Sequence, residues 1–253
     1  MTKRIIGIVN IKDGVAVQSI NFVNFLPIGD PAIIVDFLYR WGIDEIVMLD
    51  ISRDINFDKR FFKKLKLYTK NIFVPIAVGG GIKDISHAHY LFRNGADKVI
   101  INTEFFNNPD LVKKISNKFG KQSVVISLDF KRVNKKFQIF SNNGRKIEKE
   151  KVEKFLDKAQ NLGAGELIIN SINRDGSKMG FDNSLINFVE KNTNLPFNIV
   201  GGAGREEDFA KAMSSQANGI CAGNFFLFKE HSVLSTKKYL SSKFKEKIRD
   251  GWH

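Results

Sequence analysis

Short apolar segments recur along the chain, and each is followed by a longer amphipathic stretch. The segments begin near Ile5, Glu45, Pro75, Lys98, Ser123, Glu166, Pro196 and Gly219. Apolar runs without polar alternation are typical of strands that are buried on both faces, as in a parallel sheet. Eight such strands alternating with helices predict an α/β fold, a closed (βα)8 or TIM barrel, which typically needs about 250 residues.

The two halves of the sequence resemble each other at an offset of 121 residues. Residues 42–54 align with residues 163–175. The identical pairs include Glu45/Glu166, Ile51/Ile172, Arg53/Arg174 and Asp54/Asp175. The glycine-rich segments after Pro75 and Pro196 repeat at about the same offset. The sequence therefore predicts one domain over residues 1–253, built from two duplicated half-barrels of about residues 1–120 and 121–245.

Composition narrows the classes of protein that need considering. A hydrophobic fraction of 43% with 26% charged residues is typical of a folded globular protein. No apolar run approaches the roughly 18 residues that a membrane span needs, so we expect a cytoplasmic protein. Cys221 is the only cysteine, which excludes an internal disulfide and a cysteine-built metal centre. We expect no metal and no cofactor.

The chain carries a net charge of +13, and such a surface attracts nucleic acids, membranes or anionic metabolites. Most lysines lie among Phe and Leu at helix-like spacing, in the segments 63–70, 113–121, 146–154 and 237–247. This spacing indicates solvated outer helices, and no nucleic-acid-binding module accompanies it. We therefore expect neither nucleic acid nor a membrane as a partner. A phosphorylated small molecule would still be attracted by the charge.

Two excursions interrupt the strand rhythm, each after the first strand of a half. Residues 12–30 are predicted to form a mobile loop that carries Gln18 over the site. Residues 131–148 contain Phe137–Phe140 followed by Asn143-Gly144, which predicts a hairpin with Asn-Gly at its turn. Since functional groups of a barrel lie at the carboxyl ends of its strands, both excursions are expected to cover the catalytic mouth.

Glycines follow the third and seventh predicted strands at duplicated positions. Glycine lets backbone N–H groups approach an oxyanion closely, and short helices at the fourth and eighth strand ends would complete each cradle. The predicted phosphate contacts are Gly80, Gly81, Asn102, Thr103, Gly201, Gly202, Gly223 and Asn224. The alternative is that the glycines only make tight turns. Two cradles suit a long ligand with two phosphate groups.

Ten motifs distributed over the chain carry a family resemblance. They are Lys12-Asp13-Gly14, Asn21-Phe22, Gly29-Asp30-Pro31, Leu49-Asp50-Ile51, Val78–Ile82, Gly95–Val99, Asp129–Val133, Gly163–Glu166, Arg174-Asp175-Gly176 and Gly201–Gly204. Over essentially its whole length the chain resembles the cyclase subunit of imidazole glycerol phosphate synthase. The resemblance implies a barrel that pairs with a HisH-like glutaminase subunit, receives ammonia through its interior and adds it to a sugar-phosphate at the opposite mouth. It also adds Asp175 and Gly176 to the expected phosphate contacts.

The ammonia-delivery end that the resemblance implies is intact. The family's charged gate at the barrel bottom falls on Arg4, Glu45, Lys98 and Glu166. Asp97 falls where the family contacts the docked glutaminase. The alternative for Asp97 is a surface turn between a helix and a strand.

The catalytic mouth departs from the family's pattern. The symmetric pair of carboxylates falls on Asn10 and Asp129, and the lysine of the first loop falls on Gln18. Asparagine hydrogen-bonds but cannot shuttle a proton, so half of the acid–base pair is missing. Further amides replace hydroxyl residues of the family at Asn143, Asn170 and Asn224. Lys12, Asp13 and Asp50 match family positions of their own, so no replacement base is evident.

The gate at the barrel bottom is intact, whereas the catalytic mouth is altered. This combination favours a paralogue that channels ammonia to a different acceptor. Relatives of this kind accompany a glutaminase and an ATP-dependent amidotransferase in making amidino-modified sugars for bacterial surface polysaccharides or flagellar glycans. One alternative is the orthodox cyclase of histidine biosynthesis, which would have to tolerate Asn10 and Gln18. Another is a non-catalytic scaffold that only stimulates a glutaminase.

Overall fold

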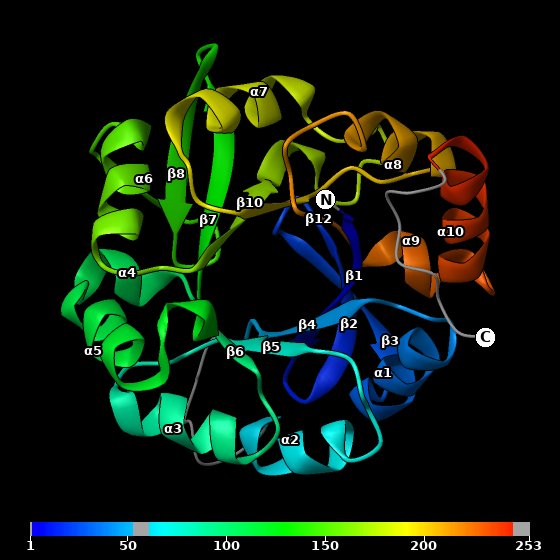
Figure 1. Ribbon diagram of the computed structural model, residues 1–253, viewed down its shortest axis with the longest axis horizontal. Helices are drawn as coiled ribbons and strands as arrows, with labels where there is room; N and C mark the ends of the chain where they lie inside the picture. Colours follow the sequence, from blue (N-terminus) through cyan, green and yellow to red (C-terminus); the bar gives the residue numbers. More distant parts are fainter. Residues whose placement is uncertain (1, 53–60, 245–253) are drawn as a thin grey trace.

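The computed structural model describes residues 2–52 and 61–244, which form a closed barrel of parallel strands surrounded by helices (Figure 1). The barrel strands, in order around the barrel, are β1 (Arg4–Lys12), β4 (Glu45–Asp50), β5 (Ile76–Gly79), β6 (Lys98–Ile101), β7 (Val124–Val133), β10 (Glu166–Ser171), β11 (Phe197–Val200) and β12 (Gly219–Ala222). Pairing of β12 with β1, and of β7 with β10, closes the sheet.

The predicted strands are confirmed, since each barrel strand begins within one residue of its predicted start. Strands β7, β10, β11 and β12 begin 120 or 121 residues after β1, β4, β5 and β6. The spacing between strand starts that repeats in the sequence therefore also repeats in the barrel. Arg53 and Asp54, which belong to the repeated segment, lie outside the described residues, as does the chain from residue 245 onward.

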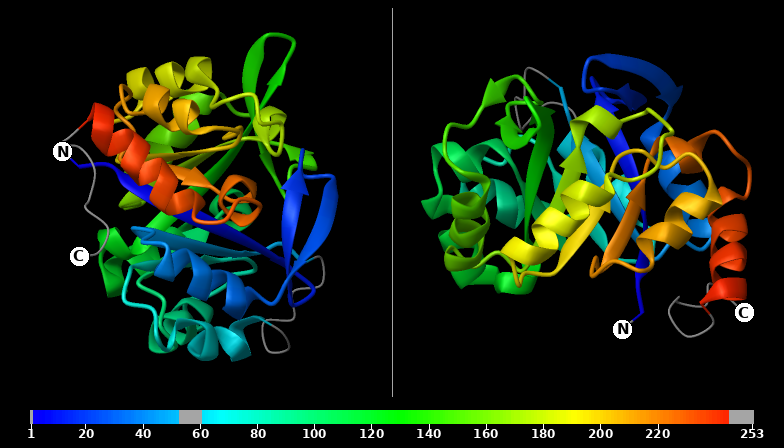
Figure 2. Two further views of the ribbon diagram at one scale, coloured as in Figure 1. Left: turned by 90° about the vertical axis from the view of Figure 1, so that its right-hand side faces the viewer. Right: turned by 90° about the horizontal axis from the view of Figure 1, so that it is seen from above.

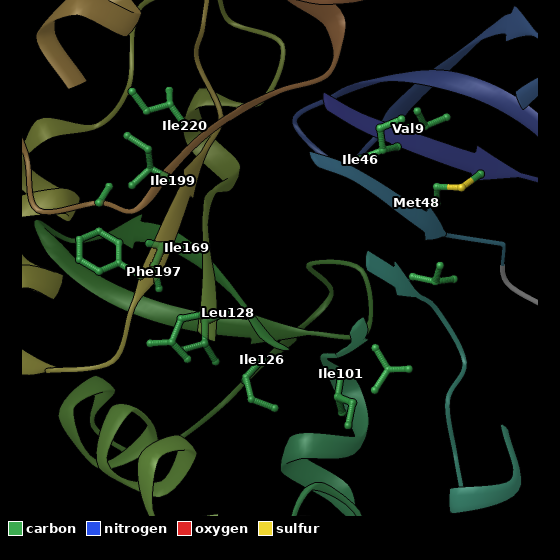
Figure 3. Close-up of a cluster of buried hydrophobic side chains, with 14 of the residues drawn as sticks. Val9, Ile46, Met48, Ile101, Ile126, Leu128, Ile169, Phe197, Ile199 and Ile220 are labelled. Carbon is green, nitrogen blue, oxygen red and sulfur yellow. The ribbon is translucent and has the colours of Figure 1, made fainter. Parts of the chain in front are cut away.

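Helices cover the outside of the barrel, and their apolar faces pack against the outward-facing residues of the strands. These helices are α1 (Pro31–Arg40), α2 (Phe61–Thr69), α3 (Ile85–Arg93), α5 (Asp110–Phe119), α6 (Val152–Asn161), α7 (Asn183–Asn192), α8 (Glu206–Ala212) and α10 (Ser232–Lys243). Figure 3 shows part of the resulting core, in which Val9, Met48 and Leu128 lie among isoleucines of neighbouring strands. Lys113 and Lys114 of α5 are exposed, as expected for a solvated outer face.

The inward-facing residues form a second, smaller apolar layer inside the barrel. It consists of Ile6, Ile8, Val47, Ala77, Ile100, Val125, Ile168 and Cys221, with Leu49 and Val200 packed against it. Alternation along each strand puts these residues inside and the main core outside. The barrel interior is thus lined with apolar groups between its two ends.

Both excursions form β-hairpins at the same end of the barrel (Figure 2). Residues 12–30, predicted to form a mobile loop, contain β2 (Val15–Ile20), which pairs with β1, and β3 (Asn24–Gly29), which pairs with β2, so this segment has regular secondary structure. In the second excursion β7 pairs with β8 (Lys136–Ser141) through a turn at Asn134-Lys135, both at positive φ. The Asn143-Gly144 pair instead makes the next turn, between β8 and β9 (Lys146–Ile147).

The C-terminal helix α10 begins at Ser232, five residues before the predicted lysine-rich segment. Lys237 of this helix is buried and pairs with Asp44 at 2.6 Å. Asp44 also accepts a hydrogen bond from the Ile5 N–H. The helix is thereby fixed beside the starts of β1 and β4. Trp252, which the sequence favours as a residue that packs against the barrel, lies outside the described residues. Among the helices described, none is long and apolar enough to span a membrane.

Candidate functional site at the barrel mouth and bottom

A cavity of about 510 Å³ opens at the carboxyl ends of the barrel strands. Asn10 and Asp129 line it, together with every predicted phosphate contact: Gly80, Gly81, Asn102, Thr103, Asp175, Gly176, Gly201, Gly202, Gly223 and Asn224. Gln18 does not line it. Gln18 lies on β2 opposite Leu26, and the neighbouring Ser19 faces the cavity in its place.

Asp129 ends the inward-facing row of β7 and is 5% exposed. It lies between the corresponding residues of the two neighbouring strands, Asn102 after β6 and Asn170 on β10. The Asn102 Nδ2 donates a hydrogen bond to Asp129 Oδ2 at 2.8 Å. Burial raises the pKa of Asp129 to about 7, the charge of Asp175 adds to the rise, and hydrogen bonds from Asn102 and Asn170 oppose it. This carboxyl group can therefore both give and accept a proton near neutral pH.

Asp129 fixes the orientation of the two side-chain amides beside it, those of Asn102 and Asn170. Because their N–H groups face the carboxylate, the amide oxygens point away, and Asn102 Oδ1 and Asn170 Oδ1 are buried without a hydrogen-bond partner among the described residues. Buried polar atoms are rarely unpaired. Asn10 lines the same cavity from β1, where it supplies a further amide but no group that titrates.

Asp175 is a half-buried carboxylate that also lines the cavity. Its Oδ2 accepts hydrogen bonds from the Ser19 hydroxyl at 2.6 Å and from the Phe22 N–H at 3.2 Å. Burial raises the pKa of Asp175, and these two hydrogen bonds oppose the rise. The carboxylate is thus directed at the β2–β3 hairpin.

The glycine loops are shaped by close packing. Gly80 and Gly202 have φ of 110° and 106°. A Cβ on Gly80 would lie 2.3 Å from Asp50 O, and one on Gly202 would lie 2.1 Å from Gly180 O. Both positions therefore require glycine for packing alone. The loops nevertheless line the cavity, and short helices begin beside them as expected, namely α4 (Thr103–Asn107) and α9 (Asn224–Leu227).

Four basic residues that were not singled out from the sequence also line the cavity: Lys83, Arg145, Lys178 and Lys229. Lys83 follows the first glycine loop by two residues, and Arg145 follows the Asn-Gly turn, so their positions could have been inferred from these motifs. Lys229 pairs with Glu206 at 2.5 Å. Cations at the rim make the mouth suitable for an anionic ligand.

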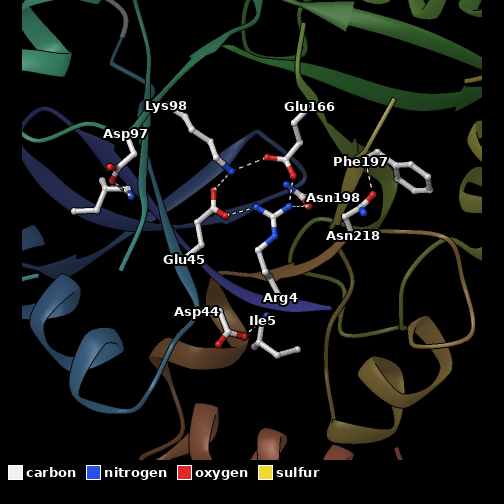
Figure 4. Close-up of polar contacts among 11 residues, drawn as sticks. Arg4, Ile5, Asp44, Glu45, Asp97, Lys98, Glu166, Phe197, Asn198 and Asn218 are labelled. Carbon is white, nitrogen blue, oxygen red and sulfur yellow. Dashed lines mark hydrogen bonds and ion pairs between the residues drawn. The ribbon is translucent and has the colours of Figure 1, made fainter. Parts of the chain in front are cut away.

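At the opposite end of the barrel, Arg4, Glu45, Lys98 and Glu166 form a closed ring of ion pairs (Figure 4). Lys98 Nζ lies 2.8 Å from one oxygen of each glutamate, and Arg4 pairs with the other oxygen of each. The glutamate side chains are 2% and 8% exposed. Each carboxylate therefore has two cationic partners, one on either side.

The electrostatics of the ring follow from its geometry. Burial alone would raise the pKa of Glu166, but Lys98 and Arg4 outweigh it and lower that pKa. Burial would likewise lower the pKa of Arg4, but Glu45 and Glu166 raise it. Both partners thus remain charged. The ring closes the bottom of the apolar barrel interior.

Asp97 lies exposed at the same end, directly before β6. Its Oδ2 accepts a hydrogen bond from the Ile76 N–H at 2.8 Å. Asn218, which stands 121 residues later, accepts one from the Phe197 N–H in the same way. Asp97 therefore supports the start of a neighbouring strand, a role that the duplication repeats.

Comparison with known proteins agrees with this arrangement. A family model described as "Histidine biosynthesis protein" matches residues 4–232. The chain belongs to this family. It is 39% identical over 240 residues to the imidazole glycerol phosphate synthase subunit HisF of Thermotoga sp. (strain RQ2), covering 95% of each chain. It is 38% identical to the subunit of the same name from Natranaerobius thermophilus and 36% identical to that from Dehalococcoides mccartyi (strain BAV1), each over 244 residues and at least 96% of both chains.

The chain is thus a HisF-like member of the histidine biosynthesis protein family with an amide at Asn10. Among the residues that the structure describes, no three His, Cys, Asp or Glu side chains are grouped so as to hold a metal ion. The Ser19–Asp175 contact joins residues 156 positions apart. No local motif of the sequence could have indicated it.

Proposed function

We propose that this chain is the synthase subunit of a glutamine-dependent enzyme, which docks a HisH-like glutaminase and passes ammonia through its barrel to a phosphorylated acceptor other than that of the histidine cyclase. The observation that carries the proposal is the contrast between the ends of the barrel. The charged ring is complete, whereas the cavity at the mouth has Asp129 on one side and Asn10 where a second acid–base group is needed.

The barrel interior supports passage of a small neutral molecule. Between the ring and the cavity the lining is mostly apolar. Its few polar groups include the side chains of Cys221 and Ser127. Burial raises the pKa of the Cys221 thiol well above its usual range, and the charge of Glu45 contributes, so the thiol remains neutral. An apolar lining disfavours ions, whose transfer from water is costly. Ammonia would enter where the ring opens and reach the cavity beside Asp129.

At the mouth, Asp129 is the group we assign to proton transfer. Its carboxyl is desolvated and held by Asn102 and Asn170, so it is fixed in position while it exchanges a proton with the acceptor. Asn10 orients the acceptor by hydrogen bonding. Backbone N–H groups of the glycine loops and the basic residues at the rim, Lys83, Arg145 and Lys178, would hold the anionic groups of the ligand.

We place the acceptor among the sugars that receive an acetamidino group in bacterial surface glycans. In this scheme an ATP-dependent amidotransferase activates the amide, and the present chain supplies the ammonia and, through Asp129, the proton transfer. Glutaminase docking at the barrel bottom would involve Asp97, which is exposed there.

The orthodox cyclase reaction is the second candidate. Identity of 36–39% to subunits with that name over at least 95% of the chain favours it. Asp175, whose pKa is also raised and whose charge acts on Asp129, offers a second carboxyl group in the same cavity. A glutaminase-activating scaffold without chemistry of its own would need no raised carboxyl pKa at the mouth.

The test uses the chain purified together with its glutaminase and glutamine labelled with ¹⁵N at the side-chain amide. The proposal expects glutamine hydrolysis to be stimulated by the chain and labelled ammonia to enter an amidino-sugar when the amidotransferase is added. Formation of labelled imidazole glycerol phosphate at an ordinary enzymatic rate would favour the second candidate. Absence of any glutaminase stimulation would contradict the proposal.

A further inference from the structure

The hairpin β2–β3 belongs to the first half of the chain but is fastened to the second half. The Ser19 hydroxyl and the Phe22 N–H both donate to Asp175 Oδ2, and the Asn21 N–H donates to the Asp175 carbonyl oxygen at 3.2 Å. Asn224 Nδ2 donates to the Ser19 carbonyl oxygen at 2.9 Å. Four hydrogen bonds therefore connect one hairpin to the loops after β10 and β12.

The turn between β8 and β9 is fastened in the opposite direction, from the second half to the first. The Asn142 N–H donates to Thr103 Oγ1, and Asn143 Nδ2 donates to the Ile51 carbonyl oxygen, each at 3.2 Å. Each excursion is thus hydrogen-bonded to loops of the opposite half of the barrel, across the mouth. Each is held by loops that line the ligand cavity of the other half.

The β2–β3 hairpin is closely packed where it is hydrogen-bonded to the second half. Ser19 is 2% exposed. Gly176 has φ of 69°, and a Cβ there would lie 2.9 Å from the Ser19 carbonyl oxygen. A Cβ on Gly144 would lie 3.1 Å from the Phe22 ring. The hairpin tip therefore fits between two glycines, one at the end of η2 (Ile172–Arg174) and one in the β8–β9 turn.

The contact reaches the second glycine cradle through Asn224. The side-chain amide of Asn224 has two hydrogens, and one of them is used by the Ser19 carbonyl oxygen. Asn224 lies at the start of α9 and lines the cavity beside Gly201 and Gly202. Its second hydrogen is left for a ligand. Asp175 Oδ2 is meanwhile occupied by Ser19 and Phe22, whose hydrogen bonds favour the charged form of the carboxylate.

We infer that Ser19 and Asp175 are positioning residues that hold the β2–β3 hairpin over the mouth and, through it, orient the Asn224 amide toward an anionic group in the second cradle. This rests on the proposed function, because it assumes that the cradle binds phosphate. Closure of the hairpin and anion binding then favour each other, since both fix Asn224 in one orientation. Neither residue needs to react with the ligand.

The test compares Ser19→Ala and Ser19→Thr with the wild type, and uses Val23→Ala as a matched control on the exposed tip of the same hairpin. Hydrogen–deuterium exchange over residues 15–29 reports hairpin closure, and calorimetric titration with inorganic phosphate reports the cradle. Because one hydrogen bond is removed, Ser19→Ala is expected to accelerate exchange and weaken phosphate binding about 2- to 10-fold. Ser19→Thr retains the hydroxyl and is expected to restore both, and Val23→Ala to change neither.

Three contradicting outcomes can be told apart. If Ser19→Ala exchanges and binds phosphate as the wild type does, the positioning role is wrong while the proposed function is unaffected. If the wild type shows no phosphate binding and no slowing of hairpin exchange by phosphate, the anion site itself is wrong and the coupling fails with it. Faster exchange with unchanged phosphate affinity would also overturn the coupling to Asn224.

Discussion

At the bottom of the barrel two buried glutamates are each flanked by an arginine and a lysine, whereas at the mouth Asp129 is buried between two asparagines. Glu166 and Asn170, one from each set, lie at the two ends of the same strand, β10. Cationic partners lower the pKa of Glu166, and burial without them raises the pKa of Asp129 to about 7. Position in the fold therefore does not set the protonation state of a buried carboxyl group, but its partners do.

This difference in protonation suits the two ends of the barrel to different roles. Groups that stay charged can form a stable closure, because opposite charges hold one another in place. A group that titrates near neutral pH can transfer protons. We therefore expect substitutions at the bottom to act mainly on stability and passage, and substitutions at the mouth to act mainly on chemistry.

The largest effect is expected for Asp129→Asn. The amide keeps the shape of the side chain but cannot carry a proton, and general acid–base catalysis typically contributes about 10²- to 10⁴-fold in rate. Transfer of ammonia to the acceptor should fall by that factor, measured with saturating ammonium so that the glutaminase is bypassed. A loss of less than about 5-fold would remove Asp129 from the chemistry. Circular dichroism would verify that the variant is folded.

Next in size is Arg4→Met, which leaves two buried glutamates with only Lys98. Removing one partner of a buried ion pair typically costs about 3–5 kcal/mol, so the free energy of unfolding in urea should fall by that amount. The control is Arg40→Met, whose exposed pair with Asp36 should be worth no more than about 1 kcal/mol. Equal effects of the two substitutions would mean that the ring does not stabilise the barrel.

The titration of Asp129 gives a pH dependence of known sign. Its pKa is higher in the folded chain than the ordinary 3.8, so between about pH 4 and pH 7 the folded state holds a proton that the unfolded state has lost. Stability contributed by this group is therefore full at low pH and is lost as the pH rises to about 7, on the order of 4 kcal/mol. Urea unfolding of wild type and Asp129→Asn across this range should diverge with rising pH, with the wild type falling relative to the variant. Parallel curves would contradict the raised pKa.

A substitution in a glycine loop is expected to have a smaller effect on the free energy of unfolding. Gly202→Ala should destabilise the chain by about 1–3 kcal/mol, because the Cβ would collide with the Gly180 carbonyl oxygen. Gly14→Ala is the matched control, since Gly14 also has positive φ but has no atom within 4 Å of its Cβ position. The difference in unfolding free energy between the two variants isolates the collision from the backbone conformation. If Gly14→Ala were equally destabilising, close packing would not explain the loop.

Sequence patterns were sufficient for the barrel because each strand is a local apolar run and the two halves repeat it. The glycine loops could also be located, since glycine at positive φ is a local requirement. Contacts between distant segments could not. The hydroxyl of Ser19 gains its role only because the fold brings Asp175 next to it. Gln18, one position away on β2, points to the opposite face of the strand. Hairpin β2–β3 lacks an Asn-Gly turn, and only a mobile loop was predicted over this segment.

The central claim is that the mouth has lost one acid–base group at Asn10 while the delivery end is complete. The direct measurement is the rate of imidazole glycerol phosphate formation with saturating ammonium, in the wild type and in Asn10→Asp, which restores a carboxyl opposite Asp129. The account predicts almost no product from the wild type and a gain of about 10²-fold or more from the variant. An ordinary enzymatic rate from the wild type, unchanged or lowered by the substitution, would contradict it.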